Sequence, residues 1–130
     1  GASFGFSPAV RADGVTPAAD PHLPQPLWFK DYAVDVEQAD PDSMLALYRA
    51  ALAIRQESLT ATRDTTAEQV DMGDDVVAYT RAAVGGRVFT SITNFGNAPV
   101  ALPDGSVVLA SGPLTPEGQL PTDTSAWVIK

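Results

Sequence analysis

The sequence contains no cysteine and only one histidine, His22, among its 130 residues. Without thiols there can be no disulfide and no thiolate metal site. A lone imidazole lacks the partners that a zinc site needs, and no credible base is available to a serine nucleophile. No apolar run approaches the roughly 18 residues of a membrane-spanning helix, and no stretch resembles a signal peptide. We therefore expect a cytoplasmic protein that holds no metal ion and no cofactor.

Basic residues are also scarce. The chain has 8 Lys and Arg side chains against 16 Asp and Glu, which gives a net charge of -8. Such a chain is repelled by nucleic-acid backbones and by anionic membranes, so we expect neither as a partner. The hydrophobic fraction of 45% is ordinary for a globular protein. The length allows one domain, or one domain plus a piece of another.

Residues 1–39 lack a regular hydrophobic period. Prolines break any helix or central strand there, at Pro8, Pro17, Pro21, Pro24 and Pro26. The segment nevertheless carries more aromatic side chains than a free linker does, namely Phe4, Phe6, Trp28, Phe29 and Tyr32. We expect an irregular loop segment that lies against another surface.

The stretch from Asp40 to Leu59 is the one strong helix signal in the sequence. We expect Asp40 to be the N-cap and Pro41 to occupy the first helical position. Apolar side chains recur at helical spacing and cover about half of the circumference: Met44, Leu45, Leu47, Tyr48, Ala51, Leu52 and Ile54. A stripe of that width needs neighbours on more than one side. Where it is left uncovered, it predicts self-association through the exposed helix face.

After a polar stretch at 60–66, the pattern changes to short β-rich runs. These runs occupy residues 68–72, 76–83, 88–95, 98–102, 106–110 and 125–129. Gly85-Gly86 predicts a hairpin, and Pro103-Asp104-Gly105 predicts a tight turn. The pattern predicts an α+β fold that is mainly antiparallel β, arranged as a sandwich or partly open barrel. The expected core includes Tyr79, Val88, Ile92, Leu102, Leu109 and Trp127.

Three stretches, in this order, resemble a known family. They are Phe4-Gly5-Phe6-Ser7-Pro8 with Leu23-Pro24-Gln25-Pro26, then the helix from Asp40-Pro41-Asp42-Ser43 to Arg55, and finally Val77-Ala78-Tyr79-Thr80-Arg81 with a strand ending Thr93-Asn94-Phe95. Together they resemble the C-terminal part of α-amylase-type enzymes of glycoside hydrolase family 13. The resemblance is strongest to bacterial α-glucosidases and oligo-1,6-glucosidases, and it runs over nearly the whole chain.

The resemblance implies a domain organisation. In that family a (β/α)8 catalytic barrel is followed by a small antiparallel β domain. Residues 1–39 would be the irregular loop segment from the end of the barrel, 40–59 the last barrel helix, and 67–130 a C-terminal β-sandwich with Greek-key-like connections. The partners implied are the upstream barrel of the parent chain and, through the parent, an α-glucoside substrate.

The resemblance also bears on the site. The family's catalytic carboxylates belong to upstream barrel strands, so no catalytic residue is expected in this sequence. Phe4 and Phe6 would lie on a loop near the substrate, where their rings either cover a sugar or pack against the barrel. His22 stands where relatives commonly have Trp, and the loop at 11–20 looks longer than usual. Both differences bear on which substrate the parent prefers.

Two alternatives come from other functional classes. The chain would be a stand-alone carbohydrate-binding β-sandwich if Trp28 and Trp127 were exposed sugar platforms, or it would be a purely structural interaction domain. Trp127 lies on a predicted strand and shares one face with Ile129, which favours core packing. The acidic turn of Asp71, Asp74 and Asp75 matches no calcium loop and is interpreted as a solvated turn. Solvent exposure of the aromatic rings would discriminate between an enzyme fragment and a binding module.

Overall fold

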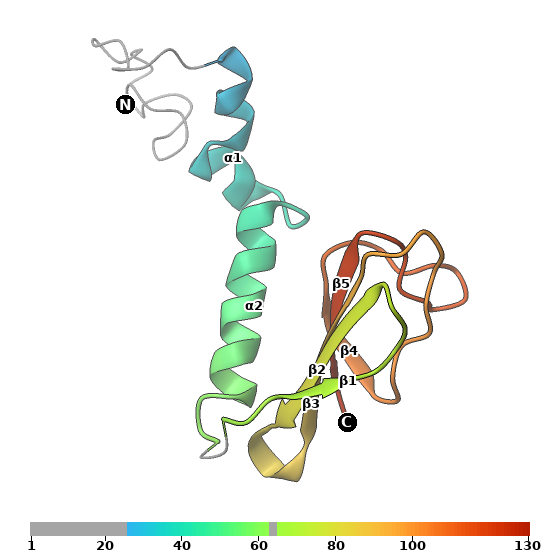
Figure 1. Ribbon diagram of the computed structural model, residues 1–130. Helices are drawn as coiled ribbons and strands as arrows, with labels where there is room; N and C mark the ends of the chain where they lie inside the picture. Colours follow the sequence, from blue (N-terminus) through green and yellow to red (C-terminus); the bar gives the residue numbers. More distant parts are fainter. Residues whose placement is uncertain (1–25, 63–64) are drawn as a thin grey trace. The chain divides into compact units, whose positions relative to one another are not determined.

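The computed structural model describes residues 26–62 and 65–130 (Figure 1). The chain divides into two compact units, residues 1–49 and residues 50–130. Each unit is described by itself.

In the first unit, two short helices occupy part of the segment that the sequence predicted to be irregular. They are the 3-10 helix η1, Leu27–Tyr32, and the helix α1, Val34–Ala39. The prediction was wrong for these residues because the prolines of the segment end at Pro26. Pro26 immediately precedes η1, where a missing N–H costs no helical hydrogen bond. At the junction of the two helices, the buried Ala33 accepts hydrogen bonds from the N–H groups of Val36 and Glu37 at 3.0 and 2.9 Å.

The long helix α2, Met44–Ser58, begins later than its sequence suggested. The Ser43 hydroxyl accepts a hydrogen bond from the N–H three residues later at 3.1 Å and donates one to the Glu37 carbonyl at 2.7 Å. Ser43 is therefore the N-cap. The Asp40 carboxylate instead accepts the N–H two residues later at 2.9 Å, as in an Asx turn. The expectation that Asp40 caps the helix and Pro41 opens it was wrong, since both lie in the preceding turn.

The second unit is built around one antiparallel sheet of five strands (Figure 1). The strands are β1, Glu68–Val70; β2, Val76–Ala82; β3, Val88–Asn94; β4, Ser106–Ala110; and β5, Thr124–Ile129. Their order in the sheet is β1-β2-β3-β5-β4, which places β5 between β3 and β4. The predicted α+β fold dominated by antiparallel β structure is confirmed.

The run at 98–102 was also expected to be a strand, and this was wrong. Only Val100 pairs there, in an isolated bridge with Leu120. Each of the two residues donates its N–H to the other's carbonyl, at 3.0 and 2.8 Å. Pro99 and Pro103 remove two of the N–H donors that a longer ladder would need.

Hydrophobic clusters lie on both faces of the sheet, because alternate strand residues point to opposite sides. The buried members of the larger cluster are Val76, Ala78, Ile92, Leu120 and Ala126, and half-buried Val100, Leu102 and Leu114 pack against them. These last three and Leu120 come from the β3–β4 and β4–β5 connections, so those connections cover this face. The second cluster consists of Ala83, Phe89 and Ile129, with half-buried Leu59, Val108 and Trp127 against them.

The expected core is confirmed in part. Ile92 is fully buried, and Trp127 packs against the second cluster while half-buried. Tyr79 and Val88 were wrongly assigned, because they are 45% and 43% exposed. On β2 the small Ala78 takes the core position and turns its neighbour Tyr79 to the other face. Val88 opens β3 directly after the hairpin, where nothing covers it fully.

Candidate functional site

The residues with predicted roles near a substrate, Phe4 and Phe6, lie outside the described part of the chain, as does His22. Within residues 26–62 and 65–130, no group of three His, Cys, Asp or Glu side chains could hold a metal ion. No helix of the described residues is long and apolar enough to cross a membrane.

Two acidic side chains in turns have structural roles: Asp71, which belongs to the acidic turn discussed above, and Asp104 in the turn before β4. The Asp71 carboxylate accepts the Gly73 N–H at 3.1 Å and so shapes the turn before β2. The Asp104 carboxylate accepts a hydrogen bond from the Lys130 ammonium at 3.2 Å. These contacts fit the expectation of solvated turns.

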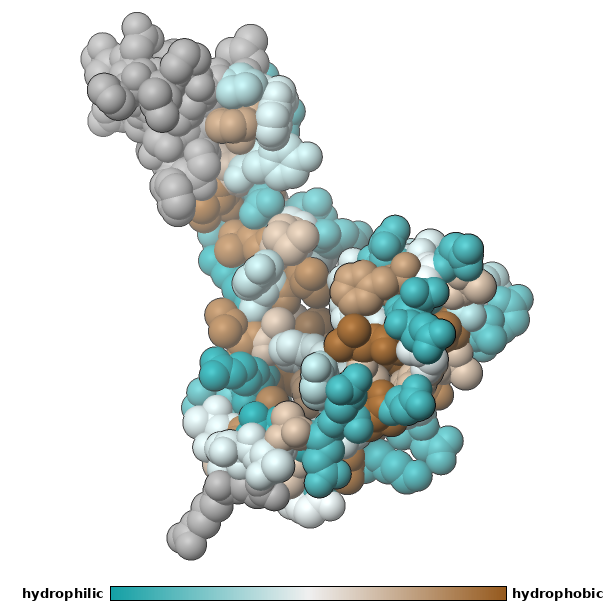
Figure 2. Space-filling view, viewed as in Figure 1, coloured by the Kyte–Doolittle hydropathy of each residue, from teal (hydrophilic) through white to brown (hydrophobic). Residues whose placement is uncertain are grey.

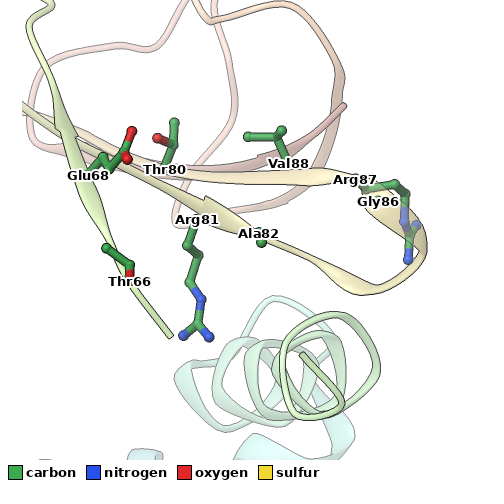
Figure 3. Close-up of a pocket in the computed structure, with 8 residues that line it drawn as sticks. All are labelled: Thr66, Glu68, Thr80, Arg81, Ala82, Gly86, Arg87 and Val88. Carbon is green, nitrogen blue, oxygen red and sulfur yellow. The ribbon is translucent and has the colours of Figure 1, made fainter. Parts of the chain in front are cut away.

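A shallow pocket of about 320 Å³ lies beside the β2–β3 hairpin (Figure 3). It is lined by Thr66, Glu68, Thr80, Arg81, Ala82, Gly86, Arg87 and Val88. The Arg81 side chain points to the side of the sheet opposite Thr80 and donates to the Thr62 hydroxyl at 3.4 Å. Arg87 donates to the Val84 carbonyl of its own hairpin at 3.0 Å. The guanidinium groups of Arg81 and Arg87 therefore bind different partners, and the pocket does not bring them together around one ligand.

In the described part of the chain, the rings around Trp28 and Trp127 are not arranged as a flat sugar platform. Trp127 is half-buried and meets Phe89 edge to face, with ring centroids 5.2 Å apart. In the first unit Trp28 is exposed, but its ring stands at 80° to Phe29 and at 83° to Tyr32. Stacking on a sugar needs a flat apolar surface, which nearly perpendicular rings do not present together. Of the two tryptophans that the binding-module alternative requires to be exposed, Trp28 is exposed and Trp127 is half-buried.

Two groups of apolar side chains are exposed on regular elements (Figure 2). On α2, Met44, Tyr48 and Leu52 are spaced four residues apart, so they share one side of the helix. On the sheet, Val77 and Tyr79 alternate along β2 and share one face, and the exposed Phe95 follows β3 directly.

Asn94 is an important residue that the sequence analysis did not single out for a role. Its side chain is completely buried at the end of β3. The amide nitrogen donates to the carbonyls of Ala98 and Leu120, at 2.9 and 3.1 Å, and the amide oxygen accepts the Gly96 N–H at 2.9 Å. One side chain thus ties both covering connections to the sheet. The only signal in the sequence was an amide at the end of a β-branched strand, just before a glycine turn.

Comparison with known proteins gives matches to solved structures only, since no family model and no curated protein matches the sequence. The trehalulose synthase MutB from Pseudomonas mesoacidophila MX-45 is 25% identical over 87% of this chain, with a TM-score of 0.65. A MutB variant in complex with the substrate sucrose gives the same values. The isomaltulose synthase SmuA from Protaminobacter rubrum is 22% identical over 86% of this chain, with a TM-score of 0.66.

These enzymes are members of glycoside hydrolase family 13, and the similarity lies in their C-terminal region. The described chain therefore has the fold of the C-terminal part of an α-amylase-family enzyme, as the sequence resemblance implied. More particularly, the structures that it matches are glucosidase-type enzymes. The chain spans only 22% of the length of MutB and of SmuA.

Proposed function

We propose that this chain is the C-terminal part of an α-glucosidase that acts on the terminal α-linked glucose of short oligosaccharides. One observation carries the proposal: 87% of the chain matches enzymes about four times its length, one of them in complex with the short α-glucoside sucrose. The part represented here is a structural module, and the catalytic carboxylates belong upstream.

The chemistry supports this division of roles. Retaining cleavage of a glycosidic bond needs a nucleophile carboxylate and a proton donor about 5 Å apart in a shielded site. The turn carboxylates of Asp71 and Asp104 are exposed and engaged in local hydrogen bonds. The nearest contribution to a substrate contact that we propose is the loop bearing Phe4 and Phe6, which would shape a sugar subsite. In the full enzyme, Phe6→Ala should raise KM or change chain-length preference more than it lowers the chemical step.

The partner proposed for the exposed apolar groups is the upstream barrel of the same parent chain. Burying one side chain of the size of Leu52 contributes about 1.5–3 kcal/mol. Co-expression of the upstream part and this chain as separate polypeptides should therefore yield a copurifying complex. Leu52→Gln should weaken that complex, whereas Arg49→Gln, which removes another exposed side chain of α2, should leave it intact. Equal effects of the two substitutions would argue against this surface.

A second candidate activity is the isomerisation of sucrose, which the names of MutB and SmuA favour. Hydrolysis and isomerisation both begin with cleavage of an α-glucosyl bond, and they differ in the group that accepts the glucosyl unit. We also propose that the parent is cytoplasmic, and the absence of cysteine from this chain is compatible with a reducing compartment.

The test is the full-length parent with maltose, isomaltose and sucrose, followed by chromatography of the products. Release of glucose from maltose or isomaltose supports the α-glucosidase. Conversion of sucrose into an isomeric disaccharide supports the second candidate. A correctly folded parent that is inactive on all three sugars refutes both. The 130-residue chain alone is the control and should be inactive.

A further inference from the structure

The turn before β4 combines an aspartate and a glycine in an unusual setting. The Asp104 side chain is 89% exposed, and the next residue, Gly105, has φ +141°. An added Cβ at Gly105 would lie 2.7 Å from the Ile129 carbonyl oxygen and 2.8 Å from a methyl carbon of Val128. Both the backbone angle and the close approach require glycine at this position. The fold therefore requires the glycine that follows Asp104.

The backbone nitrogen of Gly105 is not held by the sheet. The ladder between β4 and β5 begins one residue later, with Ser106 opposite Ile129. Among the described residues, no acceptor takes a hydrogen bond from the Gly105 N–H. Because glycine has no side chain, nothing on this residue shields the nitrogen from the carboxyl group of Asp104.

The ion pair with Lys130 does not prevent the Asp104 carboxyl group from moving. The two groups are 3.2 Å apart, and the Lys130 side chain is itself 67% exposed to solvent. Pairs this exposed contribute about 1 kcal/mol or less and exchange readily with water.

We propose that Asp104 is a site of spontaneous conversion to isoaspartate. The Gly105 nitrogen attacks Cγ of the protonated Asp104 carboxyl group and loses its own proton. An N–C bond forms, the C–OH bond breaks, and the hydroxyl group leaves with that proton as one water molecule. The product is a five-membered succinimide. Water then adds to the original main-chain carbonyl carbon of Asp104 and breaks its bond to the Gly105 nitrogen. The ring opens, and the main chain now runs through Cβ and Cγ of residue 104. Water released in the first step balances water consumed in the second, and no other reactant is needed.

The modification would act on a vulnerable strand. β4 is an edge strand, paired only with β5, and its ladder already shifts register between Val107 and Leu109. One extra main-chain atom at residue 104 displaces Gly105 from its close packing on the Ile129 carbonyl. We expect β4 to separate from β5, while the pairing of β2, β3 and β5 persists.

The test is ageing of the purified 130-residue chain at neutral pH, with isoaspartate measured by an isoaspartyl methyltransferase and located by peptide mapping. The Asp104 peptide should accumulate isoaspartate, and Asp104→Glu should abolish the signal because the corresponding six-membered ring forms far more slowly. Asp123 is the internal control, since it is also exposed but precedes Thr124. Equal accumulation at Asp123 would show that the glycine is not responsible and would overturn the proposal.

A parallel sample unfolded in urea decides whether the folded turn permits the reaction. Comparable rates in the folded and unfolded chains support the proposal. Isoaspartate that forms at Asp104 only in urea would show that the native turn keeps the two groups apart, and the proposal would fail. In the aged chain, amide exchange should accelerate in β4 and stay slow in β3. Unchanged protection of β4 in fully converted protein would refute the proposed displacement.

Discussion

Asn94→Ala should be among the most damaging single substitutions in the β unit. The native side chain satisfies three backbone groups, the N–H of Gly96 and the carbonyls of Ala98 and Leu120. A buried polar group that loses its partner costs roughly 1–3 kcal/mol. The Leu120 carbonyl keeps a second hydrogen bond, from the Val100 N–H at 3.0 Å, so its loss is partly compensated.

The remaining two groups set the size of the effect. Ala98 is exposed and Gly96 is half-buried, so water reaches both more easily than it would reach a deep core position. Two losses at the lower end of the range, together with the small cavity left by the amide, give about 2–4 kcal/mol in the free energy of unfolding. Asn94→Asp should be no milder, because its second carboxylate oxygen would face two carbonyl oxygens.

Urea unfolding of the 130-residue chain, followed by circular dichroism, measures this loss. The midpoint should fall while the slope with denaturant stays the same, which identifies a change in stability rather than in compactness. Asn97→Ala is the matched control, since this exposed amide lies three residues away and should change stability by about 0.5 kcal/mol or less. If the two alanine variants unfold at the same urea concentration, the role assigned to Asn94 is wrong.

Three further predictions concern the packing and the exposed surfaces. Gly105→Ala should lower the free energy of unfolding by about 2 kcal/mol or more, measured by thermal unfolding, because the added Cβ would clash with Ile129 and Val128. Gly118→Ala, at φ +77° with open space around it, should lower it by only about 1 kcal/mol. Trp127→Ala should cost about 3 kcal/mol, at the low end for a core ring because the side chain is half-buried, and exposed Trp28→Ala should barely move the melting temperature. In sedimentation at high concentration, the isolated chain should self-associate and Leu52→Gln should reduce this. A strictly monomeric chain would contradict the last expectation.

Several strands could be predicted because local chemistry and packing agree there. The β2–β3 hairpin needs positive φ at its turn, and Gly85 and Gly86 supply φ of 79° and 74°. β4 matches its predicted bounds at 106–110, between the proline-glycine turn before it and the loop after it. Such segments are determined by nearby residues, so sequence patterns reveal them.

Other features depended on a choice between two possible N-caps or two possible strand faces, which the sequence alone does not decide. Asp40 and Ser43 are both good N-caps, and the Ser43 hydroxyl prevails because it also reaches the Glu37 carbonyl of the preceding helix. Tyr79 is exposed because its neighbour Ala78 takes the core position on β2. That choice of face depends on how β2, β3 and β5 are aligned with one another, which the sequence alone does not give. The predicted site residues Phe4 and Phe6 lie outside the described chain, so their role stays a prediction.

The position of β5 in the sheet has a consequence for synthesis of the chain on the ribosome. β5 is the last of the five strands to emerge, yet it pairs with both β3 and β4 and supplies Ala126 and Ile129 to the two clusters. Until it emerges, β3 has an open edge and β4 has no partner at all. The sheet therefore cannot be completed until β5 has left the ribosome. A nascent chain stalled before residue 124 would expose unpaired strand edges, the kind of surface that chaperones bind.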